Sequence, residues 1–93
     1  MRHAPRIDAT HRAIVAALKG AGCSVQALTP AGGHDAGLPD LLVGRNRRVY
    51  LLEIKTRTTD LSPGQLAWHA WWRGPAVAVV RSAAEALAAV GSA

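Results

Sequence analysis

The sequence predicts a small α/β domain, a mixed β-sheet covered by helices, with the element order α-β-β-β-α-β-α. Three observations support this fold class. Three stretches carry helix start and stop signals, short apolar runs lie between them, and Gly or Pro marks most of the boundaries. The chain has 93 residues, enough for one small domain, and no repeat or linker divides residues 1–93.

The first half of the chain contains one helix and two short strands. The helix begins near Asp8, which can serve as its N-cap, and runs to the glycines at 20–22, because apolar side chains recur at helical spacing. Cys23 to Leu28 is predicted to be a strand. A glycine-rich loop over residues 29–37 follows, and Asp40 to Val43 forms the second strand.

The second half contains the longest strand and two capped helices. Its predicted elements are a turn at 44–47, a strand at 48–56, a helix at 62–73, a strand at 76–80 and a helix from Ser82 that ends before Gly91. The strand at 48–56 is apolar on both faces, which is typical of a central strand. Ser62 and Gln65 form a capping box, with Pro63 at the first helical position.

Charge and composition narrow the classes of function. The net charge is +5 and nine of the eleven Lys and Arg residues are arginine, which favours a polyanionic partner. The alternative is a generally basic surface. Cys23 is the single cysteine, which excludes an intrachain disulfide and a cysteine zinc site within one chain. The basic arm at residues 1–6 has no apolar signal region and no run has membrane-spanning length, so we expect a cytoplasmic protein.

Three charged residues interrupt otherwise apolar runs. Glu53 and Lys55 are two apart on a predicted strand, so their side chains project to the same face, and Asp40 opens the preceding strand. Burying such groups costs free energy unless they pair or bind a metal ion. Two carboxylates beside an ammonium group therefore indicate a site for a divalent cation that activates water.

These residues carry a resemblance to a known family. The segments 37–40 (Gly-Leu-Pro-Asp) and 53–55 (Glu-Ile-Lys), followed by Gln65, resemble the signature of the PD-(D/E)XK nuclease superfamily. Within that superfamily, Leu-Ser-Pro-Gly-Gln at 61–65 follows the strand closely, and this compact form resembles the small stand-alone VRR-NUC domains of phages and bacteria. The resemblance spans nearly the whole chain and implies a restriction-endonuclease-like fold in a bacterial or phage-infected host cell.

The resemblance implies a DNA endonuclease that depends on Mg²⁺ or Mn²⁺. Asp40, Glu53 and the backbone carbonyl of Ile54 would hold the metal. Lys55 would orient the attacking water and stabilise charge on the phosphate, and Gln65 would orient water or substrate. By analogy with small relatives, the chain would act as a homodimer on branched DNA such as Holliday junctions, leaving 5′-phosphate ends.

Each of these residues also has a purely structural interpretation. Many relatives carry Glu or Gln on the first helix, facing the metal. Here the candidates are Asp8 and His11, which could instead cap that helix and pack in the core. The capping box alone explains Gln65, and Asp40 could cap a turn. A nuclease fold that binds DNA without cutting it, or that needs a partner protein, is the alternative function.

Further cations and aromatic residues suit contacts with nucleic acid. The cations expected to reach phosphates are Arg45, Arg47, Arg48 and Arg57. Each could also be an ordinary surface cation. Trp68, Trp71 and Trp72 could stack on bases, although their spacing on one helix favours packing in the core or at a subunit interface.

Overall fold

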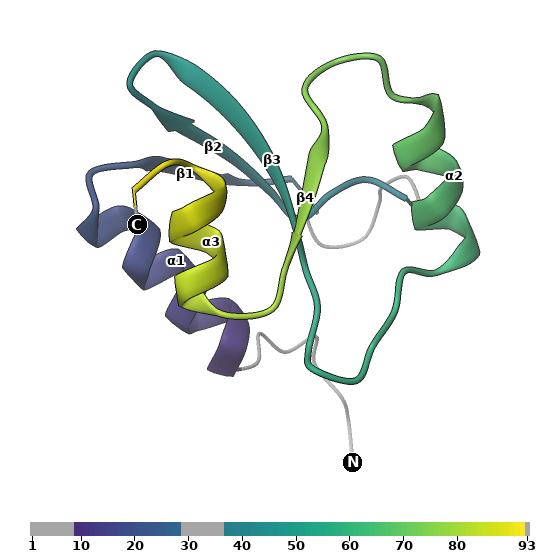
Figure 1. Ribbon diagram of the computed structural model, residues 1–93, viewed down its shortest axis with the longest axis horizontal. Coiled ribbons are helices and arrows are strands. Elements are labelled where there is room, and N and C mark those ends of the chain that lie inside the picture. The colour runs from purple at the N-terminus through teal and green to yellow at the C-terminus, as the bar shows by residue number, and fades with distance from the viewer. Residues whose placement is uncertain (1–8, 29–36, 93) are drawn as a thin grey trace.

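The computed structural model describes residues 9–28 and 37–92 and has the predicted order α-β-β-β-α-β-α (Figure 1). The elements are α1 (Ala9–Gly20), β1 (Ser24–Ala27), β2 (Leu41–Arg45), β3 (Arg48–Ile54), α2 (Pro63–Trp71), β4 (Val77–Val80) and α3 (Ala83–Ala89). The predicted N-cap Asp8, the basic arm at 1–6 and residues 29–36 of the predicted loop lie outside the described residues. None of the described helices is long and apolar enough to cross a membrane.

The four strands form one mixed sheet in the order β1-β2-β3-β4. The pairs β1–β2 and β2–β3 are antiparallel and β3–β4 is parallel, so β3 is an inner strand, as predicted. The β2–β3 ladder continues to the pair Arg45–Arg48, which leaves a hairpin turn of only Asn46 and Arg47. Both have positive φ, 52° and 64°, the backbone of a turn whose twist matches that of the flanking strands.

The hydrophobic core lies between one face of the sheet and the pair α1 and α3. Ile14 and Leu18 of α1 are fully buried against Val43 and Leu52 of the sheet, and Val90 closes the core after α3. In Figure 1, α1 and α3 lie together on one side of the sheet and α2 lies on the other. The helical spacing of apolar residues in α1 therefore predicted the face that packs.

The second face of the sheet is buried only near the end of β3. Side chains alternate along this strand, and on this face Val49 is 53% exposed, Leu51 is 6% exposed and Glu53 is 2% exposed. The prediction that β3 is covered on both faces therefore holds for its C-terminal half alone. That half leads directly into the segment that connects β3 to α2.

The boundaries of α2 follow from its caps. Ser62 caps its N-terminus, and Trp72 leaves the helix with an extended ψ of 131°. The indole Nε1 of Trp72 then donates a hydrogen bond of 2.9 Å to the carbonyl oxygen of Pro75, which folds the chain back over Gly74. The helix therefore ends at Trp71, two residues earlier than the Gly-Pro pair suggests.

Candidate active site

The antiparallel pair β2–β3 places Asp40 beside the end of β3. Its backbone amide donates to the carbonyl of Leu52 (3.1 Å) and its own carbonyl accepts from Leu28 (2.9 Å), so the residue is fixed between two strands. Its carboxylate oxygen Oδ2 accepts a 2.7 Å hydrogen bond from the backbone amide of Ile54. The carboxylate is thereby held against the residue that follows Glu53.

Glu53 lies next to Asp40 and is the one buried charged side chain among the described residues. Its Oε2 accepts a 3.0 Å hydrogen bond from Nε2 of Gln65 and lies 4.0 Å from Nζ of Lys55. Its Oε1 is buried and has no hydrogen-bond partner in the described part of the chain. Gln65 and Lys55 thus both approach one oxygen of this carboxyl group, while the other oxygen is a buried polar atom without a partner in the described residues.

The neighbouring groups perturb the carboxyl group of Glu53. The pKa of Glu53 is raised from 4.5 to about 8, mainly by burial and secondly by the neighbouring carboxyl group of Asp40, while Lys55 opposes the shift. Glu53 therefore carries a proton near neutral pH when no cation is bound. A divalent cation at this point would displace the proton and balance the two negative charges.

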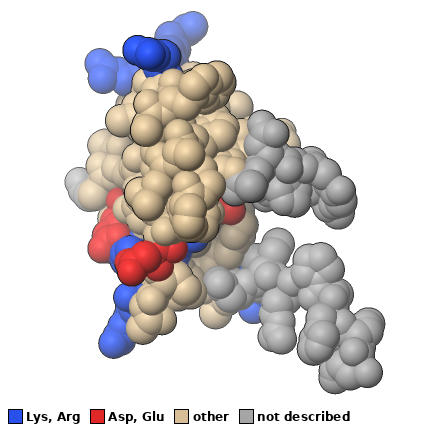
Figure 2. Space-filling view, turned by 90° about the vertical axis from the view of Figure 1, so that its right-hand side faces the viewer, with Lys and Arg blue, Asp and Glu red and all other residues tan. Residues whose placement is uncertain are grey.

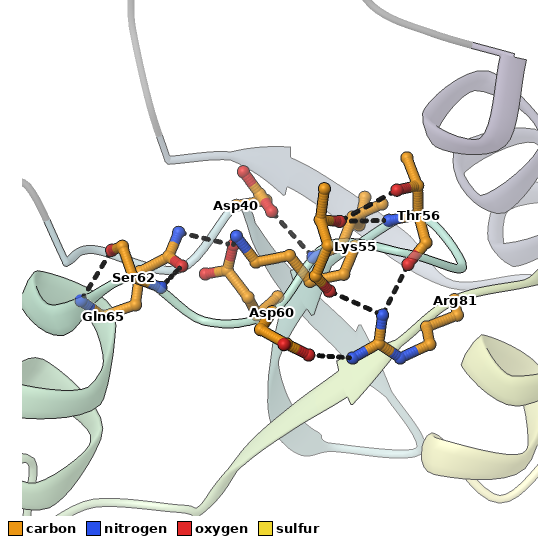
Figure 3. A network of polar contacts seen from close by, with 10 residues as sticks. Asp40, Lys55, Thr56, Asp60, Ser62, Gln65 and Arg81 are labelled. Carbon is orange, nitrogen blue, oxygen red and sulfur yellow. Dashed lines mark hydrogen bonds and ion pairs between the residues drawn. The ribbon is translucent and has the colours of Figure 1, made fainter.

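The capping box of α2 is formed by Ser62 and Gln65 (Figure 3). It brings the side chain of Gln65 to Glu53. The side-chain Oε1 of Gln65 accepts from the amide of Ser62 at 2.9 Å, and its backbone amide donates to Oγ of Ser62 at 3.2 Å. Its side-chain Nε2 is then directed at Glu53. The sequence left a capping contact and a contact with the site as alternatives for Gln65. The side-chain amide of Gln65 makes both contacts.

Gly37, which opens the Gly-Leu-Pro-Asp segment, allows α2 to approach the site. It is buried, and a Cβ atom at this position would collide with the carbonyl oxygen of Gly64 and with Cβ of Trp68. The first turn of α2, which carries Gln65, therefore packs directly against the backbone at Gly37. The glycine is required here for close contact between two backbones.

One comparison with known proteins agrees with the overall fold. A solved structure of a VRR-NUC domain superposes with a TM-score of 0.69 and 27% sequence identity, over 87% of this chain and 89% of that chain. The chain has the fold of a VRR-NUC domain. No model of a protein family and no curated protein matches the sequence.

The chain also has a histidine near Lys55 that sequence reasoning missed. His69 lies one helical turn after Gln65 on α2, and its Nε2 is buried without a hydrogen-bond partner among the described residues. Burial, and secondly the charge of Lys55, lower the pKa of His69. The sequence did contain a signal for His69, because it lies four residues after Gln65 and residues i and i+4 share a helix face.

The first helix, α1, carries His11, a further predicted residue of the site. His11 is half-buried and lines an open, largely apolar groove of about 580 Å³ between α1 and β1, together with Val15, Val25 and Leu41. It is not one of the fully buried core residues. The roles predicted for His11, and for the Ile54 carbonyl as a metal ligand, stay predictions.

The four predicted phosphate contacts have different environments. Nη1 of Arg45 donates to the carbonyl oxygens of Val90 (3.1 Å) and Gly91 (3.3 Å), so this guanidinium caps the C-terminus of α3. The other three side chains are exposed: Arg47, Arg48 and Arg57. Arg45 thus has a structural role beside its predicted contact with DNA, and the exposed arginines are better placed to meet phosphates.

The three tryptophans pack on one another rather than in the core. Trp68 stacks on Trp72 with ring centroids 5.0 Å apart, and Trp71 meets Trp68 edge-on at 5.9 Å. Trp71 is 66% exposed, and no residue of α2 is buried. The prediction that these tryptophans pack in the core of this chain is therefore wrong. Their packing at a subunit interface stays a prediction.

Proposed function

We propose that this chain, which resembles a VRR-NUC domain, is a metal-dependent endonuclease that hydrolyses phosphodiester bonds in DNA, selectively in branched DNA such as Holliday junctions. The observation that carries the proposal is the environment of Glu53. This carboxyl is 2% exposed, lies beside a second carboxyl and an ammonium group, and has one buried oxygen without a partner in the described residues. Perturbed, partly satisfied charges of this kind are typical of catalytic sites.

The residues present fit a hard cation, Mg²⁺ or Mn²⁺. No group of three or more His, Cys, Asp and Glu side chains in the described residues is arranged to hold a metal. Ligands beyond Asp40 and Glu53 would therefore be the Ile54 carbonyl oxygen and water, a set that Mg²⁺ accepts because it keeps several of its waters. When bound, the cation would lower the pKa of its water and neutralise charge on the scissile phosphate.

The chain's own side chains prepare this site in three ways. Asp40, held by the amide of Ile54, fixes one carboxylate at the open end of the hairpin. Gln65 holds Oε2 of Glu53, which leaves Oε1 directed elsewhere. The ammonium group of Lys55, on the same face, orients the attacking water and stabilises the negative charge that develops on the phosphate.

DNA and a second copy of the chain are the proposed partners. The net charge of +5 and the exposed Arg47, Arg48 and Arg57 support sequence-independent contacts with phosphates. Leu66 and Trp71 of α2 are 56% and 66% exposed, which supports a symmetric dimer formed through this helix. In a dimer, two sites can act on two strands of a junction.

Cleavage of defined DNA structures tests the proposal. The wild-type protein is incubated with a labelled four-way junction, a flap and a linear duplex, each with Mg²⁺, with Mn²⁺ and with EDTA. We expect cleavage of the junction that EDTA abolishes. Asp40→Ala and Glu53→Ala should lose it while keeping the fold, because each removes a carboxylate from the metal site.

Asp60→Asn is the matched control, since this carboxylate is 97% exposed and lies outside the site. It should cleave at the wild-type rate. Cleavage by either Asp40→Ala or Glu53→Ala at the wild-type rate would refute the assignment of the site. Binding of the junction without cleavage under every metal condition would favour the non-catalytic or partner-dependent alternative.

A further inference from the structure

Arg81 is a basic residue that neither the sequence motif nor the proposed chemistry explains. It follows β4 directly, and its side chain is 32% exposed. From there it reaches across to residues 56–60, which connect β3 to α2 and follow Lys55 in sequence (Figure 3).

The guanidinium group of Arg81 holds this connection mainly through backbone carbonyls. Its Nη1 donates to the carbonyl oxygen of Thr56 and, at 2.7 Å, to that of Thr59. Its Nη2 lies 3.9 Å from Oδ1 of Asp60, whose side chain is 97% exposed. Hydrogen bonds from a charged donor are strong, whereas a long ion pair in solvent contributes little. The two carbonyls are therefore the significant contacts.

The start of α3 fixes the backbone from which this side chain extends. The amide of Arg81 donates a 2.8 Å hydrogen bond to Oε1 of Glu85, and Oγ of Ser82 accepts a 3.1 Å hydrogen bond from the amide of Glu85. The predicted cap at Ser82 is present, but the glutamate accepts from Arg81 rather than from Ser82. The hydrogen bond from the amide of Arg81 to the side chain of Glu85 thus anchors the backbone of Arg81.

The segment that Arg81 holds begins at the proposed catalytic lysine. The amide of Lys55 donates to the carbonyl of Val80 at 3.0 Å. The amide of the next residue, Thr56, donates to Oγ1 of Thr59 at 2.9 Å. The guanidinium of Arg81 binds the carbonyls of these same two threonines, so it closes the turn immediately after Lys55.

We infer that Arg81 is a positioning residue that locks the turn after Lys55 and so keeps the lysine ammonium beside Glu53. The inference rests on the proposed nuclease activity, because only in that reaction does the position of the Lys55 ammonium group affect the rate. Arg81 contacts neither carboxyl of the site in the described structure, and acts only through the backbone at Thr56 and Thr59. A planar guanidinium suits this task, because its fork of donors is rigid and always charged.

Kinetics of Arg81→Ala and Arg81→Lys test the inference. We expect kcat on the four-way junction to fall by about 10- to 100-fold in Arg81→Ala with little change in KM, since small displacements of a catalytic group cost this much. Arg81→Lys should fall between Arg81→Ala and the wild type. Guanidine at millimolar concentration should partly restore Arg81→Ala, because the free ion can occupy the vacated position, and should leave Lys55→Ala inactive.

Two matched controls separate this role from general effects of charge. Asp60→Asn removes the exposed ion pair alone, and Arg73→Ala removes an exposed cation from the segment that follows α2. Both should keep the wild-type kcat. A loss in Asp60→Asn equal to that in Arg81→Ala would overturn the inference, as would unchanged kcat in both Arg81 variants.

Amide hydrogen exchange gives a readout that does not depend on cleavage. The amides of Lys55 and Thr56 should exchange faster in Arg81→Ala than in the wild type, because the turn opens more often. Asp60→Asn should leave them protected. Unchanged protection in Arg81→Ala overturns the inference even if the enzyme cleaves DNA. A wild type that never cleaves refutes the proposed function instead, and exchange still tests the contact.

Discussion

At the scale of single residues, Gln65 connects the helix to the site through the two ends of one amide. Its Oε1 completes the capping box and its Nε2 donates to Glu53. Gln65→Glu separates these contacts, because a carboxylate can still accept from Ser62 but cannot donate to Glu53. We expect α2 to form normally and the rate of cleavage to fall by about 10- to 100-fold, the effect of losing ~1.5–3 kcal/mol from a hydrogen bond to a charged group.

Ser62→Ala is the complementary control for Gln65→Glu. It removes the hydroxyl that caps α2, which costs about 1 kcal/mol of stability, but leaves the amide of Gln65 free to contact Glu53. Thermal unfolding should therefore show a loss of stability in Ser62→Ala, and the cleavage assay should show a loss of rate in Gln65→Glu. Cleavage by Gln65→Glu at the wild-type rate would show that Gln65 acts only as a helix cap.

The pKa of Glu53 makes the stability of the metal-free protein depend on pH. Its pKa is about 8 in the folded protein and 4.5 ordinarily, so the folded state holds a proton that the unfolded chain releases. The resulting stabilisation is fully present below pH 4.5 and is lost as the pH rises through 8. In EDTA, the melting temperature of the wild type should therefore fall with rising pH across this range more steeply than that of Glu53→Gln.

The difference between wild type and Glu53→Gln isolates this effect. The lowered pKa of His69 acts in the opposite direction, since its stabilisation grows as the pH rises, and it is common to both proteins. Added Mn²⁺ should flatten the slope of the wild type, because the cation replaces the proton, and should leave Glu53→Gln unaffected. Equal slopes in EDTA would show that Glu53 titrates normally.

At the scale of elements, α2 is held by its first turn. No residue of this helix is buried, and its described contacts with the site are the Gln65–Glu53 hydrogen bond and the close approach at Gly37. Gly37→Ala should force the helix away from the sheet, since the new Cβ has no space. We expect a loss of about 1–3 kcal/mol in stability and of most of the cleavage activity.

Gly20→Ala is the matched control for Gly37→Ala. A Cβ atom at Gly20, the last residue of α1, meets no atom within 4 Å, so alanine should be neutral or slightly stabilising there. Chemical denaturation and cleavage of the junction measure both variants. If Gly37→Ala unfolds at the wild-type concentration of denaturant and cleaves normally, the approach of α2 is not needed for the site.

The elements show which features local sequence can predict. Helical spacing and capping residues predicted the helices, and period-two alternation put Glu53 and Lys55 on one face, because these signals act within a few residues. The contact of Asp40 with the amide of Ile54 depends on the register of β2 with β3. The role of Arg81 depends on the packing of a loop that is distant in sequence. Neither has a local signal.

The tryptophans of α2 illustrate the same limit. Their spacing resembles that of a buried helical stripe, and this favoured the core. The sheet and the α1–α3 layer, however, complete the core without them, and α2 lies on the opposite side of the sheet (Figure 1). The side of the sheet that a helix covers follows from the chain's path in space, which the spacing of residues within that helix does not record.

At the scale of the whole molecule, the face on the side of α2 carries its charged side chains mainly at the margins (Figure 2). Viewed from the side of α2, uncharged side chains cover most of the face, and Lys and Arg lie at its upper edge and among the acidic groups below (Figure 2). Leu66 and Trp71 are among the most exposed large apolar residues of the described structure. An uncharged face bordered by cations suits contact with a second copy, with the cations left for DNA.

Charged substitutions on α2 should therefore dissociate the proposed dimer. Leu66→Arg and Trp71→Arg place a cation in the interface without disturbing the core, because both side chains are more than half exposed. We expect light scattering to give the mass of a dimer for the wild type and of a monomer for these variants. The variants should keep the wild-type melting transition of the fold at low protein concentration.

The products of cleavage then connect assembly to function. A monomer has one site, so Trp71→Arg should make single nicks in a four-way junction where the wild-type dimer makes paired cuts on two strands. Val49→Arg is the matched control, since Val49 is 53% exposed but lies on β3 next to the hairpin turn rather than on α2. It should stay dimeric and make paired cuts. Dissociation by Val49→Arg but not by the α2 variants would place the interface over the sheet and contradict the prediction.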